Sequence, residues 1–278
     1  MLFDLNNNWV GEVDKLTQKQ TRMLATKIQR NKQFKQVKNI SKKVDKPREH
    51  LMLNTNSSLK SRMEQKLSSS KFRWLNEQLY TQHSSGALKL FTESPELFSV
   101  YHEGFNLQTQ KWPVNPLDRI ISHLNTLPAD LLVADLGCGE ARLSLEVDQK
   151  VLSFDLVAVN SRVIACDMRN LPIETATVHI AVFCLSLMGT NVLEFLLEAR
   201  RVLKHRGNLI IAEIFSRFED IDKFISSVEE LNFKIVSRDN LTDMFVLIKF
   251  RRKKIRSIST HKIETDLFSL KPCLYKKR

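Results

Sequence analysis

Cysteine is scarce in this chain, and its placement argues against two common uses of cysteine. Four cysteines occur in 278 residues, at Cys138, Cys166, Cys184 and Cys273. Their spacing matches no metal-binding motif, and their density is too low for a disulfide framework. We therefore expect a reduced, intracellular protein without a metal site.

Long apolar segments are also lacking. The longest apolar run, residues 180–189, is about half the length of a membrane-spanning helix of roughly 20 residues. Residues 1–6 have neither the basic n-region nor the sustained apolar core of a signal peptide. We expect a soluble protein with no leader and no membrane segment.

Acidic residues are depleted at both ends of the chain. Residues 1–70 contain 15 Lys and Arg against 6 Asp and Glu, and residues 251–278 contain 10 against 2. The whole chain has 43 and 31, so residues 71–250 carry 18 against 23. Basic ends on a mildly acidic centre are typical of an enzyme that binds a polyanion, although such ends also serve as solubilising or nuclear-import tails. We expect a mostly disordered arm over 1–70, closed by a serine linker at 68–70, and a basic tail over 251–278.

The segment Val133–Arg142 contains the motif around which the chain is organised. A short apolar run ends in Asp135, and Gly137 and Gly139 follow before a helical pattern begins. Glycines at these positions permit positive φ and let a ligand approach where a Cβ would collide. We predict a buried strand that turns tightly into a helix over 140–147, with the free N–H groups of that helix facing the turn.

This motif lacks the third small residue of a dinucleotide-binding fingerprint, because Arg142 stands where G-x-G-x-x-G requires Gly or Ala. Alone, it could be only a tight turn. However, Asp155 ends the next apolar run, 20 residues beyond Asp135, and Asp167 ends the run after that. An acid on the second strand can accept ribose hydroxyls, and one on the third can reach an adenine. Three strands that each end in an acid favour S-adenosylmethionine, which has a positive amino group and sulfonium.

The pattern after Pro128 alternates between strands and helices. We predict strands at 131–135, 151–155, 163–166, 179–184, 208–214, 233–237 and 244–250, and helices at 140–147, about 190–204 and 218–231. Gly207 is placed to end the second of these helices as a C-cap. The alternation predicts an α/β fold, a Rossmann-like class I methyltransferase sheet of seven mostly parallel strands over residues 128–250, closed by an antiparallel hairpin.

A helical cap is expected before the sheet, over residues 71–127. Apolar residues recur at helical spacing from Lys71, and serines at Ser85 and Ser94 are suitable helix caps. Asn115–Pro116 is a further helix start, with a capping residue followed by proline at the first helical position.

Seven stretches lie in order along residues 72–250, and several of them are unlike the corresponding stretches of other methyltransferases. They are Phe72–Tyr80, Tyr101–Phe105, Trp112–Ile121, Ala134–Glu140, Phe154–Leu156, Cys166–Met168 and Val182–Asn191. Together they resemble the ribosomal-RNA-processing protein 8 family, also called nucleomethylin. The resemblance implies a nucleolar enzyme that uses S-adenosylmethionine to methylate N1 of an adenine in large-subunit ribosomal RNA. It implies a location in the nucleus and nucleolus, the pre-ribosome as partner and, for animal members, chromatin-silencing proteins at ribosomal DNA. We expect a monomer.

By the same resemblance, six residues would contact the cofactor. They are His102, Gly137, Asp155, Asp167, Met168 and Cys184. Three of them also have a simpler explanation: His102 and Met168 could be core residues, and Cys184, which has no evident base, is expected to be a buried, inert thiol. The turn Lys204–Gly207 departs from the Pro-Gly-Gly turn usual in the family, and we expect only a local change there.

The segment after the fourth predicted strand bears on the chemistry. Exocyclic-amine methyltransferases usually have an Asn/Asp-Pro-Pro-aromatic motif there, whereas this chain has Phe183–Ser186. Adenine N1 has a free in-plane lone pair, so catalysis would consist mainly of alignment and we assign no catalytic residue. Two alternatives remain open: a methyltransferase for a protein or small molecule, and an S-adenosylmethionine-binding subunit of a ribosomal-DNA silencing complex that methylates nothing.

Overall fold

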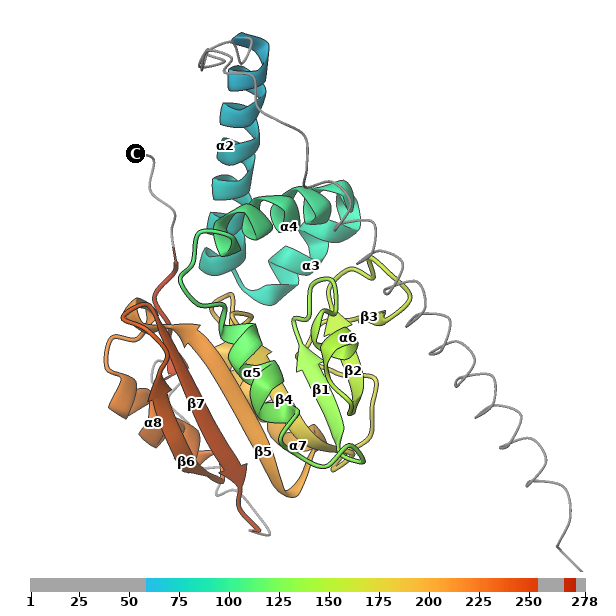
Figure 1. The fold of residues 1–278 in the computed structure, drawn as a ribbon, viewed down its shortest axis with the longest axis vertical. Helices are drawn as coiled ribbons and strands as arrows, with labels where there is room; N and C mark the ends of the chain where they lie inside the picture. Colours follow the sequence, from blue (N-terminus) through green and yellow to red (C-terminus); the bar gives the residue numbers. More distant parts are fainter. Residues whose placement is uncertain (1–58, 255–267, 274–278) are drawn as a thin grey trace, which may run out of the picture. The chain divides into compact units, whose positions relative to one another are not determined.

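The structure is a computed structural model that describes residues 59–254 and 268–273. The expectations for residues 1–58, 255–267 and 274–278 lie outside these ranges. The described residues form a cap of helices followed by an α/β domain (Figure 1). Within them, no helix combines the length and apolar character needed to cross a membrane.

Seven strands of the described chain form one sheet in the order β3-β2-β1-β4-β5-β7-β6. The strands are β1 Leu132–Leu136, β2 Lys150–Asp155, β3 Val163–Ala165, β4 Val178–Cys184, β5 Leu203–Ile214, β6 Phe233–Asn240 and β7 Phe245–Arg252. Neighbouring strands from β3 to β5 are parallel, and β7 is antiparallel to both β5 and β6. The predicted fold class is confirmed, including the closing antiparallel hairpin.

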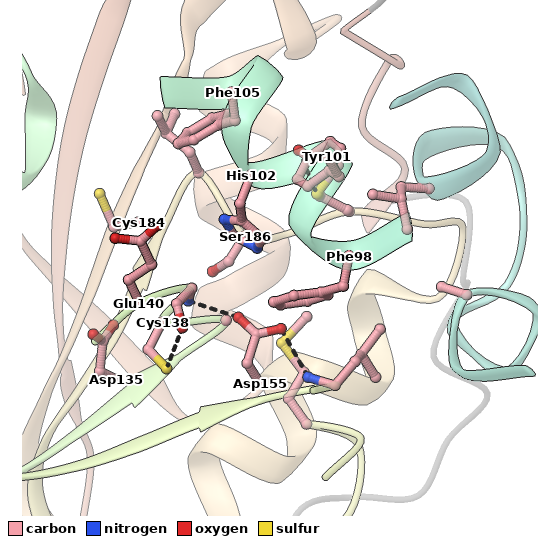
Figure 2. Close-up of a pocket in the computed structure, with 18 of the residues that line it drawn as sticks. Phe98, Tyr101, His102, Phe105, Asp135, Cys138, Glu140, Asp155, Cys184 and Ser186 are labelled. Carbon is pink, nitrogen blue, oxygen red and sulfur yellow. Dashed lines mark hydrogen bonds between the residues drawn. The ribbon is translucent and has the colours of Figure 1, made fainter. Parts of the chain in front are cut away.

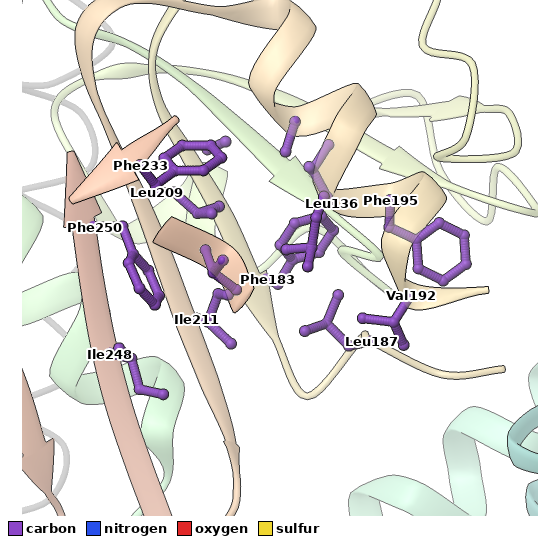
Figure 3. Close-up of a cluster of buried hydrophobic side chains, with 14 of the residues drawn as sticks. Leu136, Phe183, Leu187, Val192, Phe195, Leu209, Ile211, Phe233, Ile248 and Phe250 are labelled. Atoms are coloured by element: carbon purple, nitrogen blue, oxygen red, sulfur yellow. The ribbon is translucent and has the colours of Figure 1, made fainter. Parts of the chain in front are cut away.

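Helices cover both faces of the sheet, because the central parallel strands are apolar on both faces. Helices α7 (Val192–Val202) and α8 (Ile221–Glu230) pack on one face, where Leu136, Phe183 and Phe195 belong to the largest buried cluster (Figure 3). Helices α5 (Pro116–Leu124) and α6 (Leu143–Glu146) pack on the other face, against alternate residues of β1 and β4. The start of α5 is as predicted, with the Asn115 side chain accepting a hydrogen bond from the Leu117 N–H.

The cap has a small core of its own. It consists of α2 (Leu59–Thr81), α3 (Ser84–Glu93) and α4 (Glu96–Thr109). Its buried residues are Phe72, Leu75, Leu79, Ala87, Phe91, Phe98 and Tyr101. The linker predicted at residues 68–70 is wrong, because α2 continues through it. The hydroxyls of Ser69 and Ser70 donate to the carbonyls of Gln65 and Lys66 one turn earlier, so these serines are accommodated within the helix.

The three helices predicted in the α/β domain are all shorter in the structure, and the last of them, expected over 218–231, spans only Ile221–Glu230. The helix expected over 140–147 is limited to α6, because Ala141 has a φ of 59° and Val147 is already extended toward β2. The helix expected to run to about 204 ends at Val202. Gly207 is therefore not its C-cap and lies instead within β5.

The predicted basic tail, 251–278, is partly built into the domain. Strand β7 continues to Arg252, and residues 268–273 return to the domain surface. Phe268 and Leu270 are 1% and 7% exposed and belong to the same buried cluster as α7 and α8. The Lys271 N–H donates to the Arg217 carbonyl at 2.7 Å. This part of the tail is folded, because its apolar side chains complete the core.

A buried ion pair lies where the sheet, the cap and the tail meet. Arg217 Nη1 is 2.9 Å from Glu213 Oε1, and the two side chains are 1% and 0% exposed. Arg217 also donates from Nη2 to the Leu187 carbonyl at 2.8 Å and from Nε to the Lys271 carbonyl at 3.0 Å. Its guanidinium carbon lies 4.6 Å from the centre of the Tyr80 ring. One side chain thus contacts four separate segments.

Removal of the Arg217 cation should destabilise the folded protein. Arg217→Met leaves the Glu213 carboxylate buried without its partner, and we expect the free energy of unfolding to fall by about 3–5 kcal/mol. Arg238→Met is the matched control, because its partner Asp222 is largely exposed and such pairs contribute about 0–1 kcal/mol. Urea denaturation of the two variants measures the difference. Similar losses in both would contradict the importance assigned to the buried pair.

Candidate functional site

A cavity of about 290 Å³ lies between the cap and the carboxyl ends of β1, β2 and β4 (Figure 2). The strand order reverses at β1, with β2 on one side and β4 on the other. This is the switch point at which open α/β sheets bind ligands. All the residues predicted to contact a cofactor line this one cavity: His102, Gly137, Asp155, Asp167, Met168 and Cys184.

The two glycines after β1 are required by close contacts as well as by backbone conformation. Gly137 and Gly139 have φ values of 76° and 56°. A Cβ on Gly137 would collide with the Ser186 side chain, and one on Gly139 would lie 2.9 Å from His102 Cε1. The N–H groups of Gly137 and Cys138 donate to the Phe154 carbonyl at 2.8 and 3.0 Å. The turn is therefore fixed against both β2 and the cap.

Asp155, at the end of β2, is the polar centre of this turn. Its Oδ2 accepts a hydrogen bond from the Gly139 N–H and its Oδ1 accepts one from the Leu156 N–H, both at 2.7 Å. The prediction that helix N–H groups would face the turn is wrong, because α6 begins only at Leu143. A carboxylate has about four acceptor positions, so Asp155 can accept further hydrogen bonds from a ligand in the cavity.

Asp155 and His102 form a buried electrostatic pair. Burial raises the pKa of Asp155, and the nearby His102 and the two backbone hydrogen bonds oppose this rise. Burial also lowers the pKa of His102, with Asp155 and Glu140 acting in the opposite direction. The His102 ring packs 4.3 Å from the Phe98 ring, centre to centre. We take His102 to be a neutral ring at pH 7, part of the aromatic wall of the cavity.

Asp135 is a buried acid at the end of β1 that also lines the cavity. It is 3% exposed, and its carboxylate makes no hydrogen bond with another of the described residues. Burial, and secondarily the charge of Asp155, raise its pKa to about 7. A carboxylate of this kind that borders a cavity is stabilised in its charged form by a cationic ligand.

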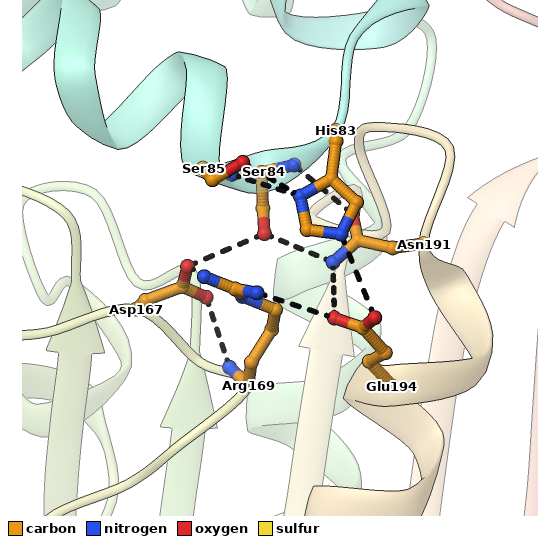
Figure 4. Close-up of polar contacts among 7 residues, drawn as sticks. All are labelled: His83, Ser84, Ser85, Asp167, Arg169, Asn191 and Glu194. Carbon is orange, nitrogen blue, oxygen red and sulfur yellow. Dashed lines mark hydrogen bonds and ion pairs between the residues drawn. The ribbon is translucent and has the colours of Figure 1, made fainter.

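Asp167, after β3, takes part in a polar cluster that ties the cap to the sheet domain (Figure 4). Asp167 Oδ2 accepts hydrogen bonds from Ser84 Oγ at 3.3 Å and from Arg169 Nε at 2.8 Å. Asn191 Nδ2 donates to Ser84 Oγ and to Glu194 Oε2, both at 2.9 Å. Sequence reasoning missed Ser84 and Asn191, and no local pattern could have joined residues 107 positions apart.

The thiols of Cys166 and Cys184 in the cavity are held in their protonated, unreactive form. Burial raises the pKa of Cys184 well above its ordinary value, with Asp135 and Glu213 adding to the rise. Burial likewise raises the pKa of Cys166 to about 12. These thiols stay protonated, as expected for Cys184. Met168 both lines the cavity and packs against the main core.

The aromatic wall is the largest part of the site that was not assigned from the sequence. Phe98, Tyr101 and Phe105 lie on α4 of the cap, and no pattern in the sequence indicated that they lie beside a ligand. The structure shows that they also line the cavity, together with Trp112. Phe105 and Trp112 meet edge to face at 5.7 Å, and Trp112 meets Phe245 at 4.9 Å. A helical aromatic pattern indicates a buried face but does not say whether a ligand shares it.

The strand order, the glycine turn and the acids at the ends of β1 and β2 define a domain of the class I methyltransferase type. A family model described as "Hypothetical methyltransferase" matches residues 58–278. Mouse "Ribosomal RNA-processing protein 8" is 48% identical over 220 residues, which are 79% of this chain and 48% of the mouse protein. The Arabidopsis thaliana protein of the same name is 44% identical over 78% of this chain and 77% of its own length.

A further relative has a more specific name. "25S rRNA (adenine(645)-N(1))-methyltransferase" of Schizosaccharomyces pombe is 41% identical over 261 residues, covering 89% of this chain and 80% of that protein. The chain belongs to the ribosomal RNA-processing protein 8 family of methyltransferases, as its sequence motifs predicted. It spans about half the length of the mouse and rat relatives, 48% in both cases.

The raised pKa of Asp135 predicts how stability depends on pH. A folded-state pKa of about 7 lies above the ordinary value, so the protonated form stabilises the ligand-free protein at low pH and this contribution is lost as pH rises through 7. Asp135→Asn stays neutral, and we expect it to gain stability relative to wild type, on the order of a few kcal/mol, between pH 4.5 and 7.5. Urea denaturation at the two pH values measures this. Asp148→Asn, at an exposed position, is the control, and a wild-type pH dependence in Asp135→Asn would contradict the assignment.

Proposed function

We propose that this chain is an S-adenosylmethionine-dependent methyltransferase that methylates N1 of an adenine in large-subunit ribosomal RNA, in the nucleolus, during ribosome biogenesis. The observation that supports the cofactor best is the buried Asp135 carboxylate, which borders the cavity without a hydrogen-bond partner among the described residues. The name of the fission-yeast relative supports the substrate.

The residues of the cavity suit the different parts of this cofactor. Asp155 can accept the ribose hydroxyls through charge-assisted hydrogen bonds. Asp135 can pair with a positive group, and Met168 can pack on an adenine face. The absence of side chains at Gly137 and Gly139 leaves the backbone accessible. When bound, S-adenosylmethionine would supply a methyl group on a positively charged sulfur.

The same residues argue for catalysis by alignment. Adenine N1 needs no deprotonation before it attacks, and the cavity offers no activated nucleophile because the Cys184 thiol is held protonated. The chain would hold the base at attack distance, and the carboxylates at the strand ends would tolerate a cationic product. Because N1 lies on the pairing edge of the base, the target adenine must be unpaired or flipped out.

The cofactor assignment predicts a specific coupling at Asp155. We expect Asp155→Ala to weaken S-adenosylmethionine binding at least about tenfold, since hydrogen bonds to a charged group are each worth roughly 1.5–3 kcal/mol. Asp155 also holds the glycine turn, so the loss alone would not distinguish contact from structure. A cofactor analogue without the ribose hydroxyls distinguishes the two. If Asp155 contacts these hydroxyls, the analogue should bind wild type more weakly than S-adenosylmethionine does, whereas Asp155→Ala should bind the two ligands about equally. Calorimetry of both ligands with both proteins measures the coupling, and additive losses would refute a direct contact.

The chemical assignment predicts the product and the pH profile. Incubation with ribosomal RNA and saturating labelled cofactor, which holds Asp135 charged, should yield N1-methyladenosine at a single-turnover rate that is flat from neutral to mildly alkaline pH, because no other group must lose a proton. Cys184→Ser should keep most of this activity.

A rate that rises with pH, an inactive Cys184→Ser with normal cofactor affinity, or a methylated exocyclic amine would overturn the mechanism. The experiment also separates the enzyme from the alternatives. A silencing-complex subunit would bind the cofactor and transfer no methyl group, and a protein or small-molecule methyltransferase would not label the RNA.

A further inference from the structure

A cluster of cations lies at the end of the sheet remote from the cavity. It consists of Lys204, His205 and Arg206 in β5 and Arg251, Lys253 and Lys254 at and after the end of β7, and we call it the distal basic patch. The cavity is at the carboxyl ends of β1 and β4, whereas β5 begins and antiparallel β7 ends at the opposite edge, away from the cap (Figure 1).

The β5 part of the patch is extruded from the sheet. Between two ladder pairs, β4 advances two residues, from Val178 to Ile180, while β5 advances five, from Leu203 to Asn208. Residues 204–207 therefore bulge out of the strand. Two residues of the bulge, His205 and Arg206, are exposed.

The bulge contains a strained backbone position that is occupied by an arginine. Arg206 has a φ of 64°, a region that costs a residue other than glycine on the order of 1–3 kcal/mol. A glycine would adopt this conformation without that cost. The following Gly207 fits because a Cβ there would lie 2.9 Å from the His179 and Lys204 carbonyl oxygens. The bulge thus keeps an arginine at a position that favours a residue without a side chain.

The patch has cations without matching anions. No carboxylate in the described ranges lies within ion-pair distance of a patch residue. Lys234 on β6 pairs in register with Arg251, which puts two like charges opposite each other. Lys204 Nζ lies 2.9 Å from His179 Nε2, and burial together with the charge of Lys204 lowers the pKa of His179, with Asp130 acting in the opposite direction.

Two further arginines lie behind the patch. Burial lowers the pKa of Arg200, and burial together with the charge of Arg200 lowers the pKa of Arg252. Arg200 Nε is buried without a hydrogen-bond partner, while Arg252 donates to the Leu203 carbonyl. Arg200 and Arg252 thus repel each other, and an anion bound at the patch would offset part of this repulsion.

We propose that the distal basic patch binds backbone phosphates of the same RNA whose target base enters the cavity. The proposal rests on the proposed function. On the unbulged partner strand β4, Val178, which pairs with Leu203 beside the patch, is six residues from Cys184 at the cavity, which corresponds to roughly 20 Å at about 3.3 Å per residue. Contacts at that distance lie outside the target nucleotide, so they supply affinity and register without reading bases.

The test compares two triple variants of the full chain. Lys204→Gln, Arg206→Asn and Arg251→Gln remove three patch charges, and Lys89→Gln, Arg119→Gln and Lys223→Gln remove three exposed charges from α3, α5 and α8. Binding of a ribosomal RNA fragment is measured by fluorescence anisotropy from 50 to 300 mM salt. We expect the patch variant to lose roughly tenfold or more in affinity, with a salt slope shallower by about 2, because each single-strand phosphate contact contributes about 0.7. The control variant should match wild type, and S-adenosylmethionine affinity should be unchanged in both.

A single substitution removes the charge without harming the fold. Arg206→Gly relieves the positive φ, so it should unfold at the same or a higher urea concentration than wild type while binding RNA less tightly. A loss of RNA affinity in a variant of undiminished stability cannot be attributed to misfolding.

The outcomes distinguish this proposal from the proposed function. If wild type methylates ribosomal RNA and the patch variant keeps the wild-type affinity and salt slope, the patch proposal fails and the function stands. If the patch variant loses RNA binding but wild type methylates no RNA, the patch stands and the function fails. If an acidic peptide of equal charge competes with RNA at equal or lower concentration, the patch is a protein-binding surface and the proposal is wrong.

Discussion

The Glu213–Arg217 pair is the constraint on which the rest of the structure depends. Two charges without exposure to water are favourable only when their remaining hydrogen-bonding groups are satisfied. Glu213 accepts from the Leu187 N–H at 3.3 Å and the Ile214 N–H at 3.2 Å, and Arg217 donates to two carbonyls on other segments. Nη1 and Glu213 are at hydrogen-bond distance but without favourable angles, so their contact is mainly electrostatic. The loop after β4, which contains Ser186, is thereby fixed relative to the sheet.

Three sets of contacts, which we call tethers, hold the cap over the cavity. The Ser84–Asn191 cluster holds the start of α3, and Asn76 Nδ2 donates to the Cys273 carbonyl at 2.6 Å, which joins α2 to the folded part of the tail. Trp112 packs on Phe245 at the start of β7. Because His102 belongs to the cap and Asp155 to the sheet, the site exists only while these tethers hold. The geometry of the cavity is thus a property of long-range contacts and not of the glycine turn alone.

The features that the sequence predicted correctly are those that depend mainly on residues close together in the chain. Alternating apolar runs identified the strands, Asn115–Pro116 identified the start of α5, and the glycine spacing identified the turn that the contacts of Gly137 and Gly139 require. The failures have a different origin. The folded tail and the bulge at Gly207 depend on partners far away in sequence, such as Arg217 for the tail and β4 for the bulge. The strand order explains why the residues predicted to contact the cofactor lie together. It does not explain the aromatic residues that the cap contributes to the same cavity.

The two ends of the sheet have opposite electrostatic character, and the proposed reaction requires both. Asp135, Asp155 and Asp167 at the cavity favour a cationic cofactor, yet the same carboxylates repel the phosphates of an RNA substrate. At the mouth, Arg142 is already neutralised by Asp118 and Glu146, at 2.6 and 2.7 Å. Attraction for RNA must therefore come from elsewhere on the chain. A separation of roughly 20 Å along β4 is more than two Debye lengths of about 8 Å at physiological salt. The distal basic patch can consequently attract RNA without weakening the hold of the acids on the cofactor.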